Sequence, residues 1–486
     1  MSPTARVQHK AVQKYLERHA EPEAAIAMRS LLVGRTYQDA LCIPAFGEGK
    51  NLFECLGSLS SDRGGSVLIL LIVNETAASP EWATRANREL VDVVAGQLGS
   101  PSRVESHLRL FTHPLGDLLL VDRTRREHPL PNGEGVGLAR KIISDIALAL
   151  WAAGQLDSDW IHCSDADALL PADYFSRARA RPSPAASGKP DSAALVYDFV
   201  HTPAARPAEA DAVLRYEIHL RYYVLGLRSA GSPYAYQSIG STLAIAPVAY
   251  AQVRGFPKRN AGEDFHLLRK LAKLGRIESL RGDPLVLSGR ISERVPFGTG
   301  VGVAREVQRI ADGEIYPAFD PCTFSWLKVW LDMLRNWAQA EAANRMALRD
   351  AILQKESAIR DSRTREPAPS QVHRESLVAV LGEVGAIRAA EAGADRGVRH
   401  QFECFDALRT LQFLRCVRDR HLPEIQLEVA VREAPFIQLP ETLPNVREGA
   451  SKPEHAFDPT LFSMRAELTR LEAQSGRDAH DLRPGP

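Results

Sequence analysis

Residues 39–74 read DALCIPAFGEGKNLFECLGSLSSDRGGSVLILLIVN. An apolar run at 39–46 is followed by two glycines, a short helical stretch follows at about 51–59, and a longer apolar run occupies 66–74. Short apolar runs bounded by glycine are typical of buried strands. Two such strands joined by a helix form a right-handed βαβ unit, which predicts a parallel sheet with helices on both faces.

Strands and helices keep alternating along the chain as far as about residue 310. Apolar periodicity predicts helices at 81–98, 136–153 and 263–275, and further strands are expected at 107–114, 159–167, 193–201 and 283–289. Beyond about residue 324 the sequence is almost entirely helical in character. We therefore expect four parts, namely a helical segment at 1–35, an α/β domain at 36–310, a helical region at 311–435 and a partly ordered tail at 436–486.

The overall composition narrows the class of protein. At 486 residues the chain exceeds the roughly 250–300 residues at which a single core stops growing, so more than one structural unit is expected. The 60 basic and 60 acidic residues give no net charge. This balance argues against a nucleic-acid binder and favours a small partner.

Cysteine usage and the length of the apolar stretches indicate the compartment. The six cysteines are scattered, with no CxxC pair, as expected for reduced thiols. Residues 1–32 lack the apolar core of a signal peptide. No stretch reaches the ~20 apolar residues that a membrane span needs. We expect a cytoplasmic protein without a transmembrane segment, with at most a peripheral membrane contact.

Two carboxylates, Asp165 and Asp167, end the strand expected at 159–167. Side chains at positions i and i+2 point to the same side of an extended backbone, so both can reach one divalent ion. Ligation by oxygen alone suits Mg²⁺ or Mn²⁺, which would bridge the diphosphate of a nucleotide donor and neutralise the departing charge. An isolated Asp-x-Asp is more often a polar turn, but the expected strand and the other motifs favour the metal site.

A second acidic pair, Glu263 and Asp264, follows Gly262 and opens the amphipathic helix expected at 263–275. Acidic residues in the first turn commonly only stabilise the helix dipole. A carboxylate in this position can also act as a general base when it reaches the reacting proton and has a suitable pKa. The context of the remaining motifs favours the catalytic interpretation.

Five segments, read in chain order, resemble the motifs of family 2 glycosyltransferases, and the resemblance covers about residues 41–300. They are CIPAFGEGKNLFECLGSL at 42–59, IVNET at 72–76, GEGVGLARKIISDIAL at 133–148, DADALLPADYF at 165–175 and VRGFPKRNAGEDFHLLRKLAKLG at 253–275. The resemblance implies a GT-A fold, which is Rossmann-like, with a mixed, mainly parallel sheet flanked by helices. It also implies sugar transfer from a nucleotide-diphosphate donor, with a UDP- or GDP-sugar favoured, to a hydroxyl acceptor.

By the same resemblance Asp264 is the general base of an inverting transferase, with Glu263 beside it in the catalytic motif. Asp165 and Asp167 hold Mn²⁺ or Mg²⁺, and Asp165 also lies near the donor. No histidine stands between residues 266 and 373, whereas related retaining enzymes often use a late histidine as a metal ligand. This absence disfavours the retaining alternative without excluding it.

The resemblance assigns the remaining donor contacts by position. Pro44, Ala45 and Glu48 would receive the nucleoside, and Asn74 would lie near the base. Arg140 would approach the diphosphate or the ribose, since an arginine in the first half of a helix under the strand ends can offer two parallel donors to phosphate.

Arginines and glycines are combined in the segment SGRISERVPFGTGVG at 288–302. We interpret it as a lid in which Arg290 and Arg294 close over the donor diphosphate, because glycine hinges and arginines suit such a role. An ordinary surface loop with two arginines is nearly as common, so this assignment is a hypothesis.

Several residues depart from the family pattern. Asn74-Glu75 stands where the second strand usually ends in an Asp pair, Lys141 replaces an Asn, and Phe46-Gly47 replaces Tyr-Asn. These changes leave the nucleobase and the sugar open. Two other functions also stay open: a catalytically inactive nucleotide-sugar-binding or scaffold protein, and a nucleotidyltransferase.

Tryptophans and leucines recur at helical spacing in the C-terminal region. They are Trp326, Leu327, Trp330, Leu331, Leu334 and Trp337. Such a stripe is more often core than a docking surface. We expect the helical region to support the acceptor site, to form a homodimer or to dock on a partner.

Overall fold

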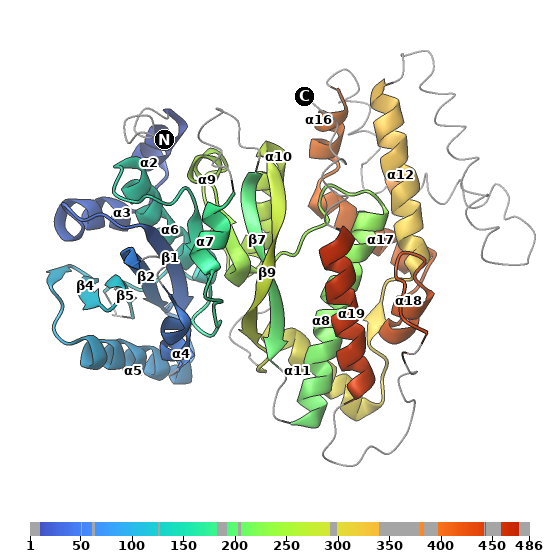
Figure 1. Ribbon diagram of the computed structural model, residues 1–486, viewed down its shortest axis with the longest axis horizontal. Coiled ribbons are helices and arrows are strands. Elements are labelled where there is room, and N and C mark those ends of the chain that lie inside the picture. Colours follow the sequence, from blue (N-terminus) through green and yellow to red (C-terminus); the bar gives the residue numbers. More distant parts are fainter. Residues whose placement is uncertain are drawn as a thin grey trace, which may run out of the picture. The chain divides into compact units, whose positions relative to one another are not determined.

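The computed structural model describes residues 10–49, 51–60, 64–124, 127–181, 192–202, 206–291, 299–339, 380–382, 397–441, 443 and 458–475. Contacts between residues divide the chain into two compact units. The first comprises Met1–Thr202 and Ser238–Gly302, and the second comprises Pro203–Gln237 and Val303–Pro486. Figure 1 shows both units and labels many of their helices and strands.

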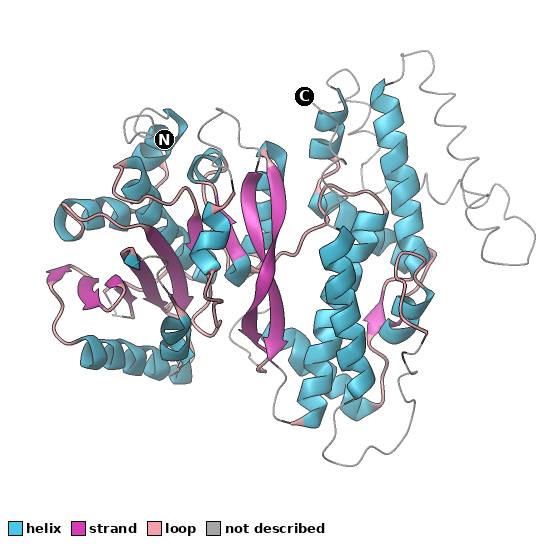
Figure 2. Cartoon of the chain, viewed as in Figure 1, coloured by secondary structure: helices cyan, strands magenta, loops and turns pink. Residues whose placement is uncertain are grey.

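The first unit contains a mixed sheet of nine strands within the described residues, in the order β3-β4-β5-β2-β1-β6-β8-β7-β9 (Figure 2). The strands β5, β2, β1 and β6 at its centre run parallel, whereas β3, β4 and β8 pair antiparallel with their neighbours and β9 pairs parallel with β7. Their bounds are β1 Asp39–Ala45, β2 Val67–Asn74, β3 Arg103–Glu105, β4 Leu108–His113, β5 Gly116–Arg123, β6 Ile161–Cys163, β7 Ser192–Thr202, β8 Leu243–Ile245 and β9 Arg276–Ser288.

Strands β1 and β2 are buried along their whole length, which explains why the sequence shows them as continuous apolar runs. Helix α6 packs against β1, β2 and β6, α5 packs against β2 and β4, and α10 packs against β7 and β9. The helices of this unit are α2 Lys10–Arg18, α3 Pro22–Ile26, α4 Asn51–Ser58, α5 Glu81–Leu98, α6 Gly135–Ala152, α7 Tyr174–Arg179, α9 Pro247–Gln252 and α10 Glu263–Leu274.

The strand order reverses at β1. The chain passes from β1 to β2 on one side, and later returns through α6 to β6 on the other side. In open α/β sheets, ligands bind in the crevice outside the carboxyl ends of the strands at such a switch point. The segments that follow β1 and β6, with Glu48 and Asp165 respectively, therefore lie where a ligand site is expected.

A buried polar network ties the first helices to α6. Lys141 Nζ donates to Tyr15 Oη, to the His19 carbonyl and to Asp145 Oδ2, each over 2.7 Å. Tyr250 Oη donates to Asp145 Oδ1 over 2.9 Å. Lys141 thus helps to fasten α2 to α6, together with the bond from Tyr15 Oη to Asp145 Oδ1.

The second unit is helical. It contains α8 Pro207–Ser229, most of α11 Thr299–Asp312, α12 Pro321–Gln339, α16 Gly397–Cys404, α17 Ala407–Arg420, α18 Leu427–Glu433 and α19 Pro459–Ser475, with a short pair of strands, β10 Pro317–Ala318 and β11 Ile425–Gln426. Helix α12 has the expected apolar stripe in the core, where Trp326, Leu327, Trp330, Leu331 and Leu334 are buried. The side chain of Trp337 lies outside the described residues.

Several elements differ from the expectations, among them β5, α8 and α19. Strand β5 was not expected, and α8 belongs to the helical unit although it lies within 36–310. Helix α19 forms within the expected tail and packs against α8. Helix α8 gives a weak sequence signal because its buried face includes charged residues, with the Glu217–Arg221 ion pair fully buried at 2.9 Å. The boundary between the units therefore differs from the expected one at residue 310.

Gly226 lets α8 approach α12. A Cβ added at Gly226 would lie 2.5 Å from Phe324 Cζ. Alanine favours a helix by about 1 kcal/mol over glycine, but overpacking commonly costs about 1–3 kcal/mol. We expect Gly226→Ala to lower the melting temperature measured by circular dichroism. The same change in a Phe324→Leu background should raise the melting temperature, and a rise in the wild-type background would contradict this packing.

Candidate functional site

The candidate site is formed by the segments that follow β1 and β6 and by the start of α10. Pro44 and Ala45 are the last residues of buried β1 and pair with Ile72 and Val73 of β2. Glu48 follows directly in the turn and is itself buried. The two β1 residues are thus buried at the end of the strand, and Glu48 brings a charge to the turn that follows.

Arg140 joins two of the predicted motifs. Its side chain, only 4% exposed, donates from Nη2 to Asp165 Oδ1 over 2.5 Å and from Nε to Glu263 Oε1 over 3.0 Å. A third bond runs from Nη1 to the Ser164 carbonyl over 3.4 Å. The guanidinium thereby holds both carboxylates in place by ion pairing. Arg140 was expected to approach the diphosphate or the ribose of the donor, and in the structure each of its three side-chain nitrogens donates to one of these protein groups.

Two glycines make this arrangement possible. A Cβ at Gly240 would lie 2.7 Å from Arg140 Nη2, so only glycine leaves room for the guanidinium. At the start of α6, Gly137 donates its N–H to the Arg259 carbonyl over 2.9 Å, and a Cβ there would strike the same backbone. The start of α6 and the segment before α10 therefore meet backbone to backbone.

Asp264 is half-buried in the first turn of α10. Burial raises the pKa of its carboxyl to about 7, and the charge of neighbouring Glu263 adds to the rise. The Phe265 N–H, which donates to Asp264 Oδ1 over 2.7 Å, and the Arg140 charge oppose that rise. A carboxyl with a pKa near 7 can both accept and release a proton at neutral pH, which suits a general base.

Asp165 and Asp167 follow β6 as predicted. The Asp165 side chain is 40% exposed, whereas the Asp167 side chain is 16% exposed. Burial, together with the Asp165 charge, raises the pKa of the Asp167 carboxyl to about 6. No group of three His, Cys, Asp or Glu side chains arranged to hold a metal ion exists among the described residues.

The donor atoms nevertheless fit a hard cation. Mg²⁺ is usually held by one or two carboxylates, with waters and substrate phosphates completing its shell. Asp165 and Asp167 offer such a pair. A positive group already lies against the second of them, since Arg290 Nη2 is 2.9 Å from Asp167 Oδ2. The site therefore accommodates a positive charge at this carboxylate.

Arg290, at the end of β9, also forms an ion pair with Glu48 through the same Nη2 atom. The structure thus brings Glu48, Asp167 and Arg290 into one cluster, separate from the contacts of Arg140. Arg294 lies outside the described residues.

Asn87 is a buried residue of α5 that the motifs did not reveal. Its side chain accepts from the Gly47 N–H over 2.8 Å and donates to the Asn74 carbonyl over 3.0 Å. It therefore clamps the end of β1 to the end of β2, where Asn74 lies buried. The sequence does contain a signal, because Asn87 is a polar residue within an otherwise apolar buried stripe of α5.

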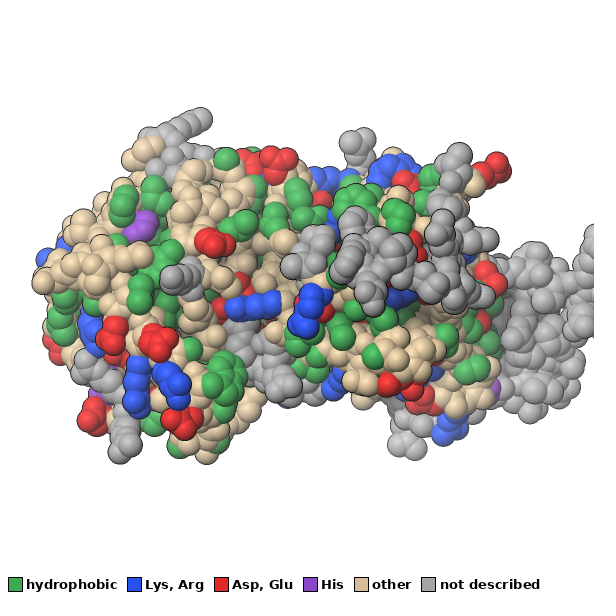
Figure 3. All heavy atoms as spheres, turned by 90° about the horizontal axis from the view of Figure 1, so that it is seen from below, with side chains coloured by type: hydrophobic (Ala, Val, Ile, Leu, Met, Phe, Trp, Pro, Cys, Tyr) green, Lys and Arg blue, Asp and Glu red, His purple; other side chains and the backbone are tan. Residues whose placement is uncertain are grey.

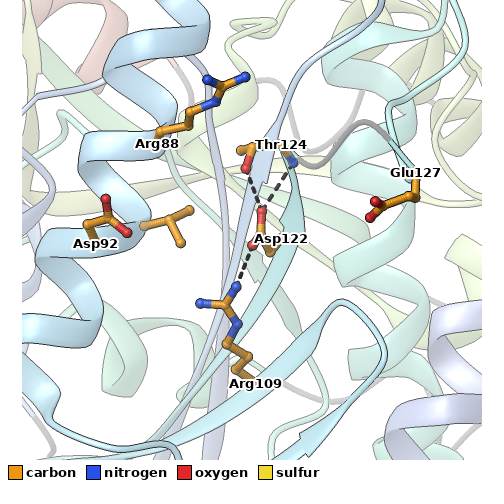
Figure 4. A pocket seen from close by; sticks show the side chains of 7 residues that line it. Arg88, Asp92, Arg109, Asp122, Thr124 and Glu127 are labelled. Carbon is orange, nitrogen blue, oxygen red and sulfur yellow. Dashed lines mark hydrogen bonds and ion pairs between the residues drawn. The ribbon is translucent and has the colours of Figure 1, made fainter.

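A separate open cavity of about 560 Å³ lies beside the end of β5 (Figure 4). Arg109 donates to Asp122 Oδ2 over 2.7 Å, and the Thr124 hydroxyl donates to Asp122 Oδ1 over 2.7 Å. Arg88, Val91, Asp92 and Glu127 complete the lining. None of the predicted site residues lines this cavity, whose two central side chains are already paired with each other.

On the face shown in Figure 3, basic and acidic side chains lie interspersed among the described residues. Among the described helices, none is both long enough and apolar enough to cross a membrane. All six cysteines are free of disulfide bonds.

No protein-family model matches the chain, and no curated protein matches it. Among solved structures, the chain is similar to the mannosyltransferase PcManGT from Pyrobaculum calidifontis in complex with GDP-Man and Mn²⁺. The two chains are 15% identical, and the match covers 85% of this chain and 99% of that chain with a TM-score of 0.29. A TM-score this low does not by itself establish a shared fold.

Removing the Arg140 guanidinium should destabilise the α/β unit, because Glu263 would be left buried without a partner. Breaking a buried ion pair from one side typically costs about 3–5 kcal/mol. We expect Arg140→Met to lower the urea midpoint measured by circular dichroism. Adding Glu263→Gln, which removes the orphaned charge, should recover part of the loss. An unchanged urea midpoint in Arg140→Met would show that the Arg140–Glu263 ion pair contributes nothing to the stability of the folded state.

Proposed function

We propose that this chain is a metal-dependent glycosyltransferase of GT-A type that uses a nucleotide-diphosphate sugar. The observation that carries the proposal is the Arg140 guanidinium, which binds Asp165 of one motif and Glu263 of the other. It brings a cation-binding acidic loop and a half-buried carboxylate with a raised pKa, Asp264, to the same edge of the sheet. Family 2 glycosyltransferases use this pair of functions, and the order of the five sequence motifs supports the same assignment.

In the proposed reaction, Asp264 accepts the proton of the acceptor hydroxyl. At the same time the oxygen of that hydroxyl forms a bond to the anomeric carbon of the donor sugar. The bond from that carbon to the donor diphosphate breaks, and its electron pair leaves with the nucleoside diphosphate. Attack opposite the leaving group inverts the configuration of the sugar carbon. Mn²⁺ or Mg²⁺, held by Asp165 and Asp167, would neutralise the diphosphate charge when bound.

The remaining roles follow from the contacts. Glu263 and Arg140 are positioning residues in this proposal, because each is bound by the other and shielded from the crevice. Pro44, Ala45 and Asn74 lie at the ends of β1 and β2, where the nucleoside would bind. The nucleobase is left open between uracil and guanine, so both donor classes enter the test.

The first test is donor binding. A ligand that binds only the folded state raises the melting temperature by mass action. We expect a UDP- or GDP-sugar to raise it in the presence of Mn²⁺ or Mg²⁺, and the shift to disappear in Asp167→Asn. The matched control is Asp173→Asn, which changes the carboxylate that stands immediately before α7 and pairs with Arg177. An absence of shift with every nucleotide sugar would contradict the transferase and favour a binding protein with another ligand.

The second test concerns the base. Since Asp264 must be deprotonated to accept the proton, kcat/KM should fall about tenfold per unit as the pH drops below about 7. Asp264→Asn should remove this limb along with most of the activity, about 10²–10⁴-fold for loss of a general base. A profile that is flat from pH 5.5 to 8, with full activity in Asp264→Asn, would assign the base elsewhere.

A further inference from the structure

Two carboxylate oxygens from distant parts of the chain meet at one nitrogen atom. Arg290 Nη2 contacts Glu48 Oε2, in the segment that follows β1. The same nitrogen lies 2.9 Å from Asp167 Oδ2, in the segment that follows β6. The two carboxylates are poorly hydrated, with side chains 7% and 16% exposed. Carboxylates withdrawn from water in this way need a positive partner.

We infer that Arg290 is an internal counter-ion for the carboxylates of Glu48 and Asp167. The Arg290 guanidinium and a divalent cation are then alternative occupants of the position beside these two carboxylates. The inference rests on the proposed function, because it concerns the cation of that reaction. The Arg290 nitrogen stands within contact distance of Asp167, where a bound ion would also have to stand. Two like charges so close together repel strongly in a poorly hydrated site, so both cannot occupy it.

The exchange has a consequence for the order of binding. A cation arriving alone must displace Arg290 and leave the guanidinium without its two partners. When a diphosphate arrives with the cation, its oxygens offer the displaced guanidinium new charge-assisted hydrogen bonds. Cation and nucleoside diphosphate therefore bind cooperatively, and each raises the affinity for the other by the same factor. Arg290 would thus couple the binding of the cation to the binding of the nucleoside diphosphate, a role that an arginine in an ordinary surface loop does not have.

The test measures Mn²⁺ binding by the intact protein, read as loss of the free Mn²⁺ signal in electron paramagnetic resonance, with and without UDP or GDP. Wild type should bind Mn²⁺ weakly alone and at least about tenfold more tightly with the nucleotide, within the usual range of coupling. Arg290→Met should bind Mn²⁺ alone at least about tenfold more tightly than wild type, with the coupling reduced toward one. Arg290→Gln, whose amide can still donate to the carboxylates, should behave alike and guards against misfolding of the first variant.

Two controls separate the outcomes. Arg281→Met changes an arginine within β9, the strand that precedes Arg290, and should leave Mn²⁺ binding unchanged, whereas Asp167→Asn should abolish it in every background. Equal Mn²⁺ affinity in wild type and both Arg290 variants, with nucleotide-dependent binding that needs Asp167, would overturn the counter-ion role and leave the proposed function standing. No Mn²⁺ binding by any variant, with or without nucleotide, would overturn both.

Discussion

The arrangement of the α/β unit depends on a buried guanidinium. Arg140 is withdrawn from water on α6, and a buried charge is tolerated only where opposite charges and hydrogen bonds meet it. Asp165 after β6, Glu263 at the start of α10 and the Ser164 carbonyl satisfy it together. Gly240 keeps its space open. One side chain therefore links three segments of the chain, namely α6, the loop after β6 and the start of α10.

Two arginines pair with four carboxylates of the crevice. Arg140 pairs with Asp165 and Glu263, and Arg290 pairs with Glu48 and Asp167. Burial raises the pKa of Asp167 and Asp264, and a neighbouring carboxylate charge adds to each rise. In the proposed function, a divalent cation bound at Asp165 and Asp167 would offset this carboxylate charge and the charge of the donor diphosphate.

The sequence predicts those helices and strands that have a clear local apolar pattern. It does not predict the elements whose formation depends on tertiary contacts. Strands β1 and β2 and helices α5, α6 and α10 were predicted because burial on one or both faces leaves a clear apolar pattern. Strand β5 was missed because it lies three residues after β4, and the two apolar runs read as one element followed by a turn. Helix α8 lacks a clean apolar stripe because Glu217 and Arg221 are buried as a pair.

The candidate site shows the same division. The sequence predicted which residue types would gather, but not that Arg140 would bind Asp165 and Glu263, since ion-pair partners far apart in the chain leave no local signal. For the same reason the roles of Asn87 and Gly240 could be recognised only from the structure. Asn87 is a polar residue in the apolar stripe of α5, and Gly240 lies beside the Arg140 guanidinium.

The acidic pair at the start of α10 shows how helix geometry divides two similar residues between two roles. Consecutive helical residues point about 100° apart, so Glu263 and Asp264 lie on adjoining faces of α10. Glu263 is directed at Arg140 and is almost fully buried. Asp264 lies on the adjoining face, half-buried, and the Glu263 charge contributes to its raised pKa. The positioning residue thereby also tunes the proposed base, so the two carboxylates are not interchangeable although they are adjacent.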